Sequence, residues 1–202
     1  RPANGIPVSE RKPYLTEVVS YLALHPNGVT NGDLRADFDI SEARVRTVLN
    51  QVRDWLGTNP NTGQKHQPYA GKGPAGQQRG VSVYELVDVL TDADLLRRLR
   101  LRGQARGPEG VEDLLAALRL VQGAPFSQLR NGGWSWLTGG ERIDEEVFTH
   151  AIVDTAHLAT TACLQSGDLN NARLATTTAL HAAPHEHIPQ LDMARITEAE
   201  GD

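Results

Sequence analysis

Residues 41–57 read SEARVRTVLNQVRDWLG, and this stretch decides the fold that we predict for the first half of the chain. Its apolar residues recur at the spacing of one helix face, which predicts an amphipathic helix. Ser41 is a favourable N-cap, and Glu42 lies where a carboxylate stabilises the positive end of a helix. A shorter helical segment, Thr30 to Phe38, comes directly before it. Two helices joined by so short a turn predict a helix-turn-helix. The apolar residues of the second helix are Val45, Val48, Leu49, Val52 and Leu56.

The residues after this helix predict a wing. Residues 58–80 are rich in glycine and glutamine and contain three prolines, and residues 81–86 read VSVYEL, which is typical of a strand. Another helix is predicted before the motif, over residues 13–24. A helix-turn-helix with such an extension is typical of a winged helix, which commonly binds DNA through the major groove. We therefore expect residues 1–90 to form a winged helix-turn-helix domain that includes a small β wing.

The charge of the chain is unevenly distributed. The whole chain carries a net charge of -5, but residues 1–90 hold ten Lys and Arg against nine Asp and Glu. Residues 91–202 hold ten against sixteen, so the acidic excess lies in the second half. Residues 44–80 contain six basic residues and one acidic residue, a local charge of +5. This cluster favours a surface for DNA phosphates, and the alternative is a solvated helix face beside a flexible loop.

Candidate DNA-contacting residues follow from the outward face of the second helix and from the predicted wing. Arginine, asparagine and glutamine can make paired hydrogen bonds with guanine and adenine edges, although the same residues are ordinary on a solvated helix. Lysine and arginine on the wing would contact phosphates, which position a protein without reading sequence. For Arg53 a second interpretation stays open, in which it braces the wing from the inner side. The candidates are Arg44, Arg46, Thr47, Asn50, Gln51, Arg53, Lys65, Lys72 and Arg79.

The second half of the chain has an all-helical pattern. We predict helices over residues 92–102, 111–121, 145–165, 170–182 and 188–199, several of them rich in alanine. The break between the second and third of these contains Trp134 and Trp136 in a glycine-rich segment. Two interpretations apply: a platform for a sugar or another ligand, or aromatic side chains that plug the joint between helical pairs. We favour the plug, because large aromatic side chains are mostly used for burial.

An internal repeat marks the same half. Gly167-Asp168 and Gly201-Asp202 lie 34 residues apart, which is the tetratricopeptide period. Ala172, Ala179 and Pro184 stand at the consensus offsets between them. Such helix pairs must stack on neighbours to bury their apolar faces, so residues 91–202 are expected to form a tetratricopeptide-like domain. We expect this array to be truncated at its end, with an exposed stacking face.

Taken in order, these motifs resemble those of the bacterial transcriptional activator domain (BTAD) family, found in actinobacterial antibiotic regulatory proteins. The resemblance implies a winged helix followed by a tetratricopeptide-like domain, and the function of a DNA-binding transcriptional regulator whose helical domain serves assembly or signal input. The N-terminal sheet of the family is mostly absent here, and the wing is longer and richer in glycine. These departures suggest a fragment and leave an alternative: a protein–protein interaction module of a larger multidomain actinobacterial protein that does not bind DNA. The matching residues are 18–26, 46–57, 84–89, 94–96, 123–126, Trp134, Trp136 and 167–168.

From the sequence we predict no enzyme activity, no cofactor and no metal site. His181, His185 and His187 gather near Asp192, but Pro184 breaks the helical spacing that a ligand pair needs. Cys163 is expected to be a buried structural thiol, and a chain with one cysteine and no secretory signal fits the cytoplasm. The expected partners are double-stranded DNA and a protein partner or a second copy bound through the helical domain. No membrane contact is expected, because no apolar run is long enough to span a bilayer.

Overall fold

The structure is a computed structural model that describes residues 5–8, 12–128, 130–138 and 145–201. The chain divides into two compact units, which we call the N-terminal unit (residues 1–89 and 129–143) and the C-terminal unit (residues 90–128 and 144–202). The boundary between the two units after residue 89 lies one residue before the predicted boundary after residue 90. Residues 129–143, which we expected within the helical domain, instead belong to the N-terminal unit.

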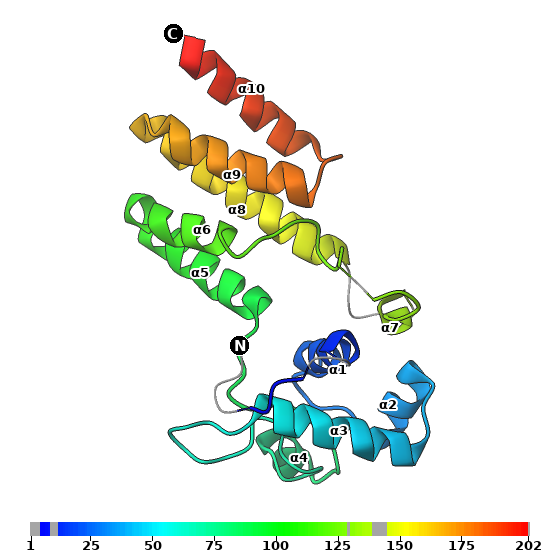
Figure 1. Cartoon of the computed structure of the whole chain (residues 1–202). Coiled ribbons are helices and arrows are strands. Elements are labelled where there is room, and N and C mark those ends of the chain that lie inside the picture. Colours follow the sequence, from blue (N-terminus) through cyan, green and yellow to red (C-terminus); the bar gives the residue numbers. More distant parts are fainter. Residues whose placement is uncertain (1–4, 9–11, 129, 139–144, 202) are drawn as a thin grey trace. The chain divides into compact units, whose positions relative to one another are not determined.

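The helix-turn-helix of the N-terminal unit is built from α2 (Asn31–Phe38) and α3 (Glu42–Leu56), with α1 (Lys12–Leu24) before them (Figure 1). Thr30 and Asp33 form a capping box at the start of α2, in which each side chain accepts a hydrogen bond from the other's backbone N–H. Asp39 takes the left-handed conformation with φ 48° and ends α2. Ser41 then caps α3, because its Oγ accepts a hydrogen bond from the backbone N–H of Arg44. These local signals place the turn at residues 39–41.

The core of the N-terminal unit lies where α3 packs against α1 and α2. The apolar stripe predicted for α3 is buried, and aliphatic side chains of α1 and of the residues around Val29 and Val83 are buried in the same unit. Burial of this stripe fixes which face of α3 is left outward. The buried apolar residues of this part are Leu15, Val18, Tyr21, Leu22, Val29, Leu34, Val45, Val48, Leu49, Val52, Leu56 and Val83.

The predicted β wing is not found. Residues 58–86 contain no strand, and their backbone pairing is limited to the isolated bridges Thr58–Lys65 and Val29–Tyr84. The segment instead folds as a loop around a short helix, α4 (Pro74–Arg79). The buried carboxylate of Glu85 accepts hydrogen bonds from two backbone N–H groups in the first turn of α4. Prolines without an N–H and glycines at positive φ interrupt the segment before a ladder of hydrogen bonds can extend.

A segment around the two tryptophans completes the N-terminal unit. We call residues 130–138, which include the short helix α7 (Ser135–Thr138), the tryptophan segment. The carboxylate of Glu17 in α1 is buried and accepts hydrogen bonds from Arg130 Nε (2.5 Å), the backbone N–H of Trp134 (2.6 Å) and Trp136 Nε1 (3.2 Å). The tryptophans therefore serve burial, as we expected, but they pack in the N-terminal unit and not at a joint between helical pairs.

The C-terminal unit is made of helices, which confirms the mainly helical class predicted for this half. Helix α5 pairs with α6, α8 pairs with α9, and α10 packs on both α9 and α8. Gly167 at φ 76° ends α8, and Asp168 caps α9 by accepting a hydrogen bond from the backbone N–H of Asn171. Gly201 is the last residue of α10, and Asp202 lies outside the described residues. The bounds are α5 (Asp92–Arg106), the 3-10 turn η1 (Gly107–Gly110), α6 (Val111–Leu118), α8 (Glu145–Ser166), α9 (Leu169–Ala182) and α10 (His187–Gly201).

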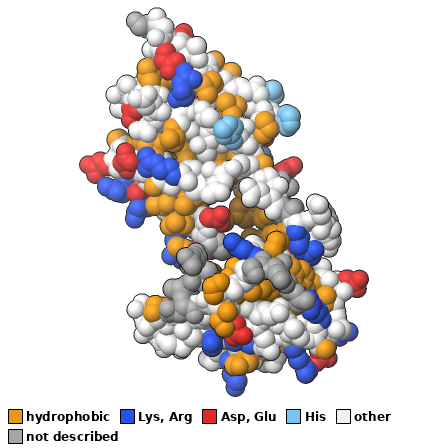
Figure 2. All heavy atoms as spheres, in the orientation of Figure 1, with side chains coloured by type: hydrophobic (Ala, Val, Ile, Leu, Met, Phe, Trp, Pro, Cys, Tyr) orange, Lys and Arg blue, Asp and Glu red, His pale blue; other side chains and the backbone are white. Residues whose placement is uncertain are grey.

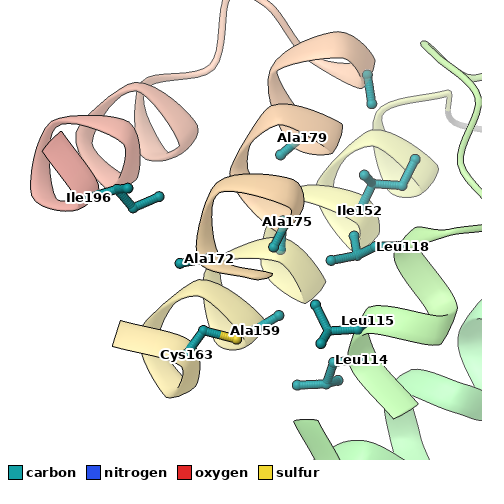
Figure 3. Close-up of a cluster of buried hydrophobic side chains, with 12 residues drawn as sticks. Leu114, Leu115, Leu118, Ile152, Ala159, Cys163, Ala172, Ala175, Ala179 and Ile196 are labelled. Carbon is teal, nitrogen blue, oxygen red and sulfur yellow. The ribbon is translucent and has the colours of Figure 1, made fainter. Parts of the chain in front are cut away.

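Small side chains dominate the core of the C-terminal unit (Figure 3). Alanines of α8 and α9 face each other, which lets the two helices pack closely, and leucines of α6 fill the space beside them. The hydroxyls of Thr160 and Thr176 hydrogen-bond across the same interface at 2.9 Å. Cys163 is buried in this core, and burial raises the pKa of its thiol. The prediction of a buried structural thiol is therefore confirmed. The core residues are Leu114, Leu115, Leu118, Ile152, Ala156, Ala159, Cys163, Ala172, Ala175, Ala179, Ala182 and Ile196.

Within residues 5–8, 12–128, 130–138 and 145–201, no helix is both long enough and apolar enough to cross a bilayer. In the same ranges no group of three or more His, Cys, Asp and Glu side chains lies close enough to hold a metal ion. Asp192, which the sequence places near three histidines, is buried and contacts His157 Nδ1 at 2.8 Å and Arg195 at 3.2 Å.

An acid-sensitive contact ties α5 to α6. Arg102 donates two hydrogen bonds to the carboxylate of Asp113, at 2.8 and 2.6 Å, and Arg106 donates a third at 3.3 Å. The hydrogen bond from Arg102 lowers the pKa of Asp113 below its usual range, although burial acts in the opposite direction. A carboxylate whose folded-state pKa is lowered stabilises the fold above its unfolded pKa of about 3.9, and that stability is lost as the pH falls through the lowered value.

We therefore expect Asp113→Asn to remove part of the acid dependence of stability in the C-terminal unit. Thermal unfolding midpoints of the wild-type chain should fall below about pH 4, and those of the variant should fall less steeply. Glu109→Gln, an exposed carboxylate in η1, is the control and should follow the wild type. Parallel acid limbs for wild type and Asp113→Asn would contradict this role.

Candidate nucleic-acid interface

The outward face of α3 carries a row of polar side chains. Arg46, Thr47, Asn50 and Asp54 are exposed, because the apolar stripe of the helix is buried on the opposite side. The side chain of Arg46 is 70% exposed and pairs with Glu42 one turn earlier. An exposed ion pair of this kind contributes little to stability, so Arg46 can exchange it for another anion at low cost. The row therefore offers a ligand one cation (Arg46), one carboxylate (Asp54) and the hydrogen-bonding groups of Thr47 and Asn50.

Arg53 does not belong to this exposed row. It is 5% exposed, and its Nε donates to the backbone oxygen of Gln67 at 2.9 Å while Nη1 donates to Asn50 Oδ1 at 2.7 Å. Its guanidinium also lies 4.0 Å from the centre of the Tyr69 ring. The candidate assignment of Arg53 as a DNA contact is therefore corrected. The side chain braces the loop against α3, which is the second of the two interpretations drawn from the sequence.

The contact with Arg53 determines what Asn50 offers to a ligand. Because its Oδ1 already accepts one hydrogen bond from Arg53, Asn50 offers a ligand its amide N–H groups and one remaining acceptor position on Oδ1. Paired recognition of adenine by asparagine uses both the oxygen and the nitrogen of the amide. Guanine and thymine present oxygen acceptors in the major groove, and the amide N–H groups of Asn50 can donate to them.

Arg44 and Gln51 lie at the edges of the outward face, and both are half-buried. The Gln51 Oε1 atom is buried, so this side chain does not extend into solvent as a paired donor and acceptor. The charge of Arg44 acts on Tyr14 in α1: burial raises the pKa of Tyr14, and Arg44 and Arg130 oppose that rise. Both residues are therefore less exposed than we expected for side chains that contact DNA.

The three loop cations are all exposed, and each lies in a different part of the loop. Lys65 lies at the bridge with Thr58, and Lys72 lies two residues before α4. Arg79 ends α4 and donates a hydrogen bond of 2.9 Å to the backbone oxygen of Asn27. Figure 2 shows Lys and Arg side chains along the border of the N-terminal unit that α3 and α4 form. Burial of Arg53 leaves the other five cations of residues 44–80 exposed or half-buried.

Tyr69 is a residue of this surface that the sequence reasoning missed. This residue is 65% exposed although its ring lies over the buried Arg53 guanidinium. A cation under one face of an aromatic ring holds the ring in place and leaves the other face outward. The signal that points to it in the sequence is a single aromatic residue between Lys65 and Lys72 in a loop of glycines and prolines.

We expect Arg53→Ala to lower the free energy of unfolding of the N-terminal unit by about 2 kcal/mol, because hydrogen bonds to charged groups contribute about 1.5–3 kcal/mol each. Urea denaturation followed by circular dichroism measures the change. Arg46→Ala removes an exposed arginine from the same helix and should change stability by less than about 0.5 kcal/mol. Equal stabilities for the two variants would mean that Arg53 is not a brace.

Comparison of the whole chain with protein-family models, with curated proteins and with solved structures gives no match.

Proposed function

We propose that this chain is a non-enzymatic, DNA-binding regulatory module in which α3 enters the major groove. The observation that carries the proposal is the exposed row of Arg46, Thr47 and Asn50 on α3, which follows α2 after a turn of three residues. The major groove admits an α-helix, and the first of two such helices lies across the backbone. The row has the side-chain types that read base edges.

Phosphate contacts are assigned to the loop between α3 and residue 81. Lys65 and Lys72 are exposed there, and Tyr69 presents one ring face beside them. In this proposal the loop takes the place of the β wing, and α4 gives it a fixed shape. Its cations would strengthen binding to any sequence, and they make binding depend on salt.

The C-terminal unit is assigned to assembly or signal input. Its two helix pairs and α10, with Gly167-Asp168 at a turn and alanines at the helix contacts, support a tetratricopeptide-like arrangement. Together with the order of motifs in the sequence, this supports placing the chain near the bacterial transcriptional activator domain family.

The test is binding of the full chain to a duplex enriched from a random library, measured by fluorescence anisotropy. Arg46→Ala should weaken binding by about 1–3 kcal/mol, which is the usual effect of losing an arginine that contacts a base. Arg119→Ala removes an exposed arginine from the C-terminal unit and is the matched control. Failure to enrich any duplex, or equal losses for the two variants, would overturn the proposal.

A second candidate function is a protein-interaction module without DNA binding. The observation that favours it is the outer face of α10, where Ile188 and Leu191 are 40% and 65% exposed and lie one turn apart. Exposed aliphatic side chains on a helix face are typical of a surface that packs on another helix. Capture of one specific protein by the full chain, lost in Leu191→Glu, together with no duplex binding, would favour this function.

A further inference from the structure

The tryptophan segment has an unusual place in the chain. In sequence it is inserted between α6 and α8, which belong to the C-terminal unit, but its described residues pack in the N-terminal unit. It reaches α1 through Glu17, whose buried carboxylate accepts three hydrogen bonds from the segment. A buried carboxylate is stable only with such partners, so Glu17 and the segment depend on each other.

The close approach of the segment to Glu17 depends on Gly133. A Cβ atom at this position would lie 2.7 Å from Glu17 Oε2 and 2.7 Å from the guanidinium carbon of Arg130. Trp134, the next residue, adopts φ 65°, a conformation that non-glycine residues rarely take. The surrounding contacts therefore hold the segment in one specific conformation.

The same segment contacts α2 through Trp136. The Trp136 ring lies 5.0 Å from the Tyr21 ring and 6.5 Å from the Phe38 ring, between centroids, and Phe38 is the last residue of α2. Tyr21 also donates a hydrogen bond of 2.5 Å to Asp37 in α2. Burial and this hydrogen bond raise the pKa of Tyr21, so its hydroxyl stays protonated as the donor. The segment thus covers the joint between α1 and α2.

Helix α2 packs on α3, but its buried face is small. It has eight residues, and Leu34 is the one that is buried. A short helix with one buried side chain is weakly held by its own packing, because most helical stability in proteins comes from a buried face. Phe38 and Asp37, through which α2 meets Trp136 and Tyr21, are therefore a large part of what fixes it.

We propose that Glu17 and Trp136 are positioning residues for the helix-turn-helix: they dock the tryptophan segment on α1 and α2 and thereby fix α2 relative to α3. The consequence of this positioning for DNA binding rests on the proposed DNA-binding function, whereas the positioning of α2 itself can be measured without DNA.

The test is hydrogen–deuterium exchange on the full chain. Trp136→Ala and Glu17→Gln should raise exchange in residues 130–138 and in α2 by about tenfold or more, and leave α3 and α9 protected. Trp136→Phe loses the indole N–H but keeps a ring against Phe38 and Tyr21. Protection of α2 should therefore be restored relative to Trp136→Ala. Glu112→Gln, an exposed carboxylate in α6, is the matched control and should change neither region.

Each outcome decides the proposal. Raised exchange in residues 130–138 with unchanged α2 would overturn it, because the segment would then be attached to α2 without positioning it. Uniform loss of protection over α1, α2 and α3 would also overturn it, since the segment would then support the whole core and not α2 in particular.

Duplex affinity measured in parallel should fall in Trp136→Ala and recover in Trp136→Phe. Equal affinity of the wild type and every variant for an enriched duplex would overturn the role of this positioning in DNA binding. Failure to bind any duplex would overturn the proposed function and leave the exchange result standing.

Discussion

Replacing Glu17 by alanine is expected to lower the free energy of unfolding of the N-terminal unit by about 3–5 kcal/mol, because breaking a buried ion pair leaves its partners uncompensated. The partners are Arg130, whose side chain is 30% exposed, and the N–H groups of Trp134 and Trp136, both of which are buried. Because water reaches Arg130 more readily than the two N–H groups, the loss should lie near the lower end of this range. Urea denaturation followed by tryptophan fluorescence measures it.

The control for this prediction is Glu112→Ala. Glu112 is an exposed carboxylate near the start of α6, and its replacement should change stability by about 0.5 kcal/mol or less. If Glu17→Ala unfolds at the same urea concentration as this control, the carboxylate does not hold the tryptophan segment on α1.

Leu115→Ala is expected to have a comparable effect in the C-terminal unit. Leu115 is 0% exposed at the centre of the core where α6 meets α8 and α9, and removal of a buried leucine costs about 2–5 kcal/mol. The alanine neighbours in this core are too small to fill the cavity. Leu101→Ala makes the same chemical change at a leucine that is 57% exposed, and it should shift the thermal midpoint little. Similar shifts for both variants would contradict the assignment of the core.

The helices of eight or more residues could be predicted because their signals are local. Ser41 acts as the cap that we expected, and Gly167 at positive φ ends α8 before Asp168 caps α9. Predicted and observed helix ends differ by a few residues at most, apart from the end of α5. The pattern of Leu and Ala in the second half was enough to give its helical class, because side-chain spacing reports the buried face directly.

The loop after α3 was predicted wrongly because its apolar run resembles a strand. Val81 and Val83 alternate with polar residues, but the partner strand that they would need is interrupted by Pro68, Pro74 and several glycines. Pairing depends on what lies opposite, and a single segment does not contain that information. Glu85 instead caps α4, a contact that no periodicity indicates.

The packing around Arg53 and Glu17 depends on contacts that are distant in sequence. Arg53 looks like an outward arginine of α3 until Gln67 and Tyr69 are placed over it. Glu17 is a charged residue in the first helix, and its partners lie more than one hundred residues later. Of the candidate contacts, Arg46, Thr47 and Asn50 lie together on the exposed face, which is the part of the site that helical spacing alone could give.

The most direct test of the account is amide chemical-shift mapping of the full chain during titration with an enriched duplex. The proposal predicts that the signals of Arg46, Thr47 and Asn50, and those of the loop around Tyr69, shift most. Signals of α9 and α10 should stay unchanged. Shifts confined to the C-terminal unit, or no saturable shift on α3 at any duplex concentration, would contradict the claim that α3 reads DNA.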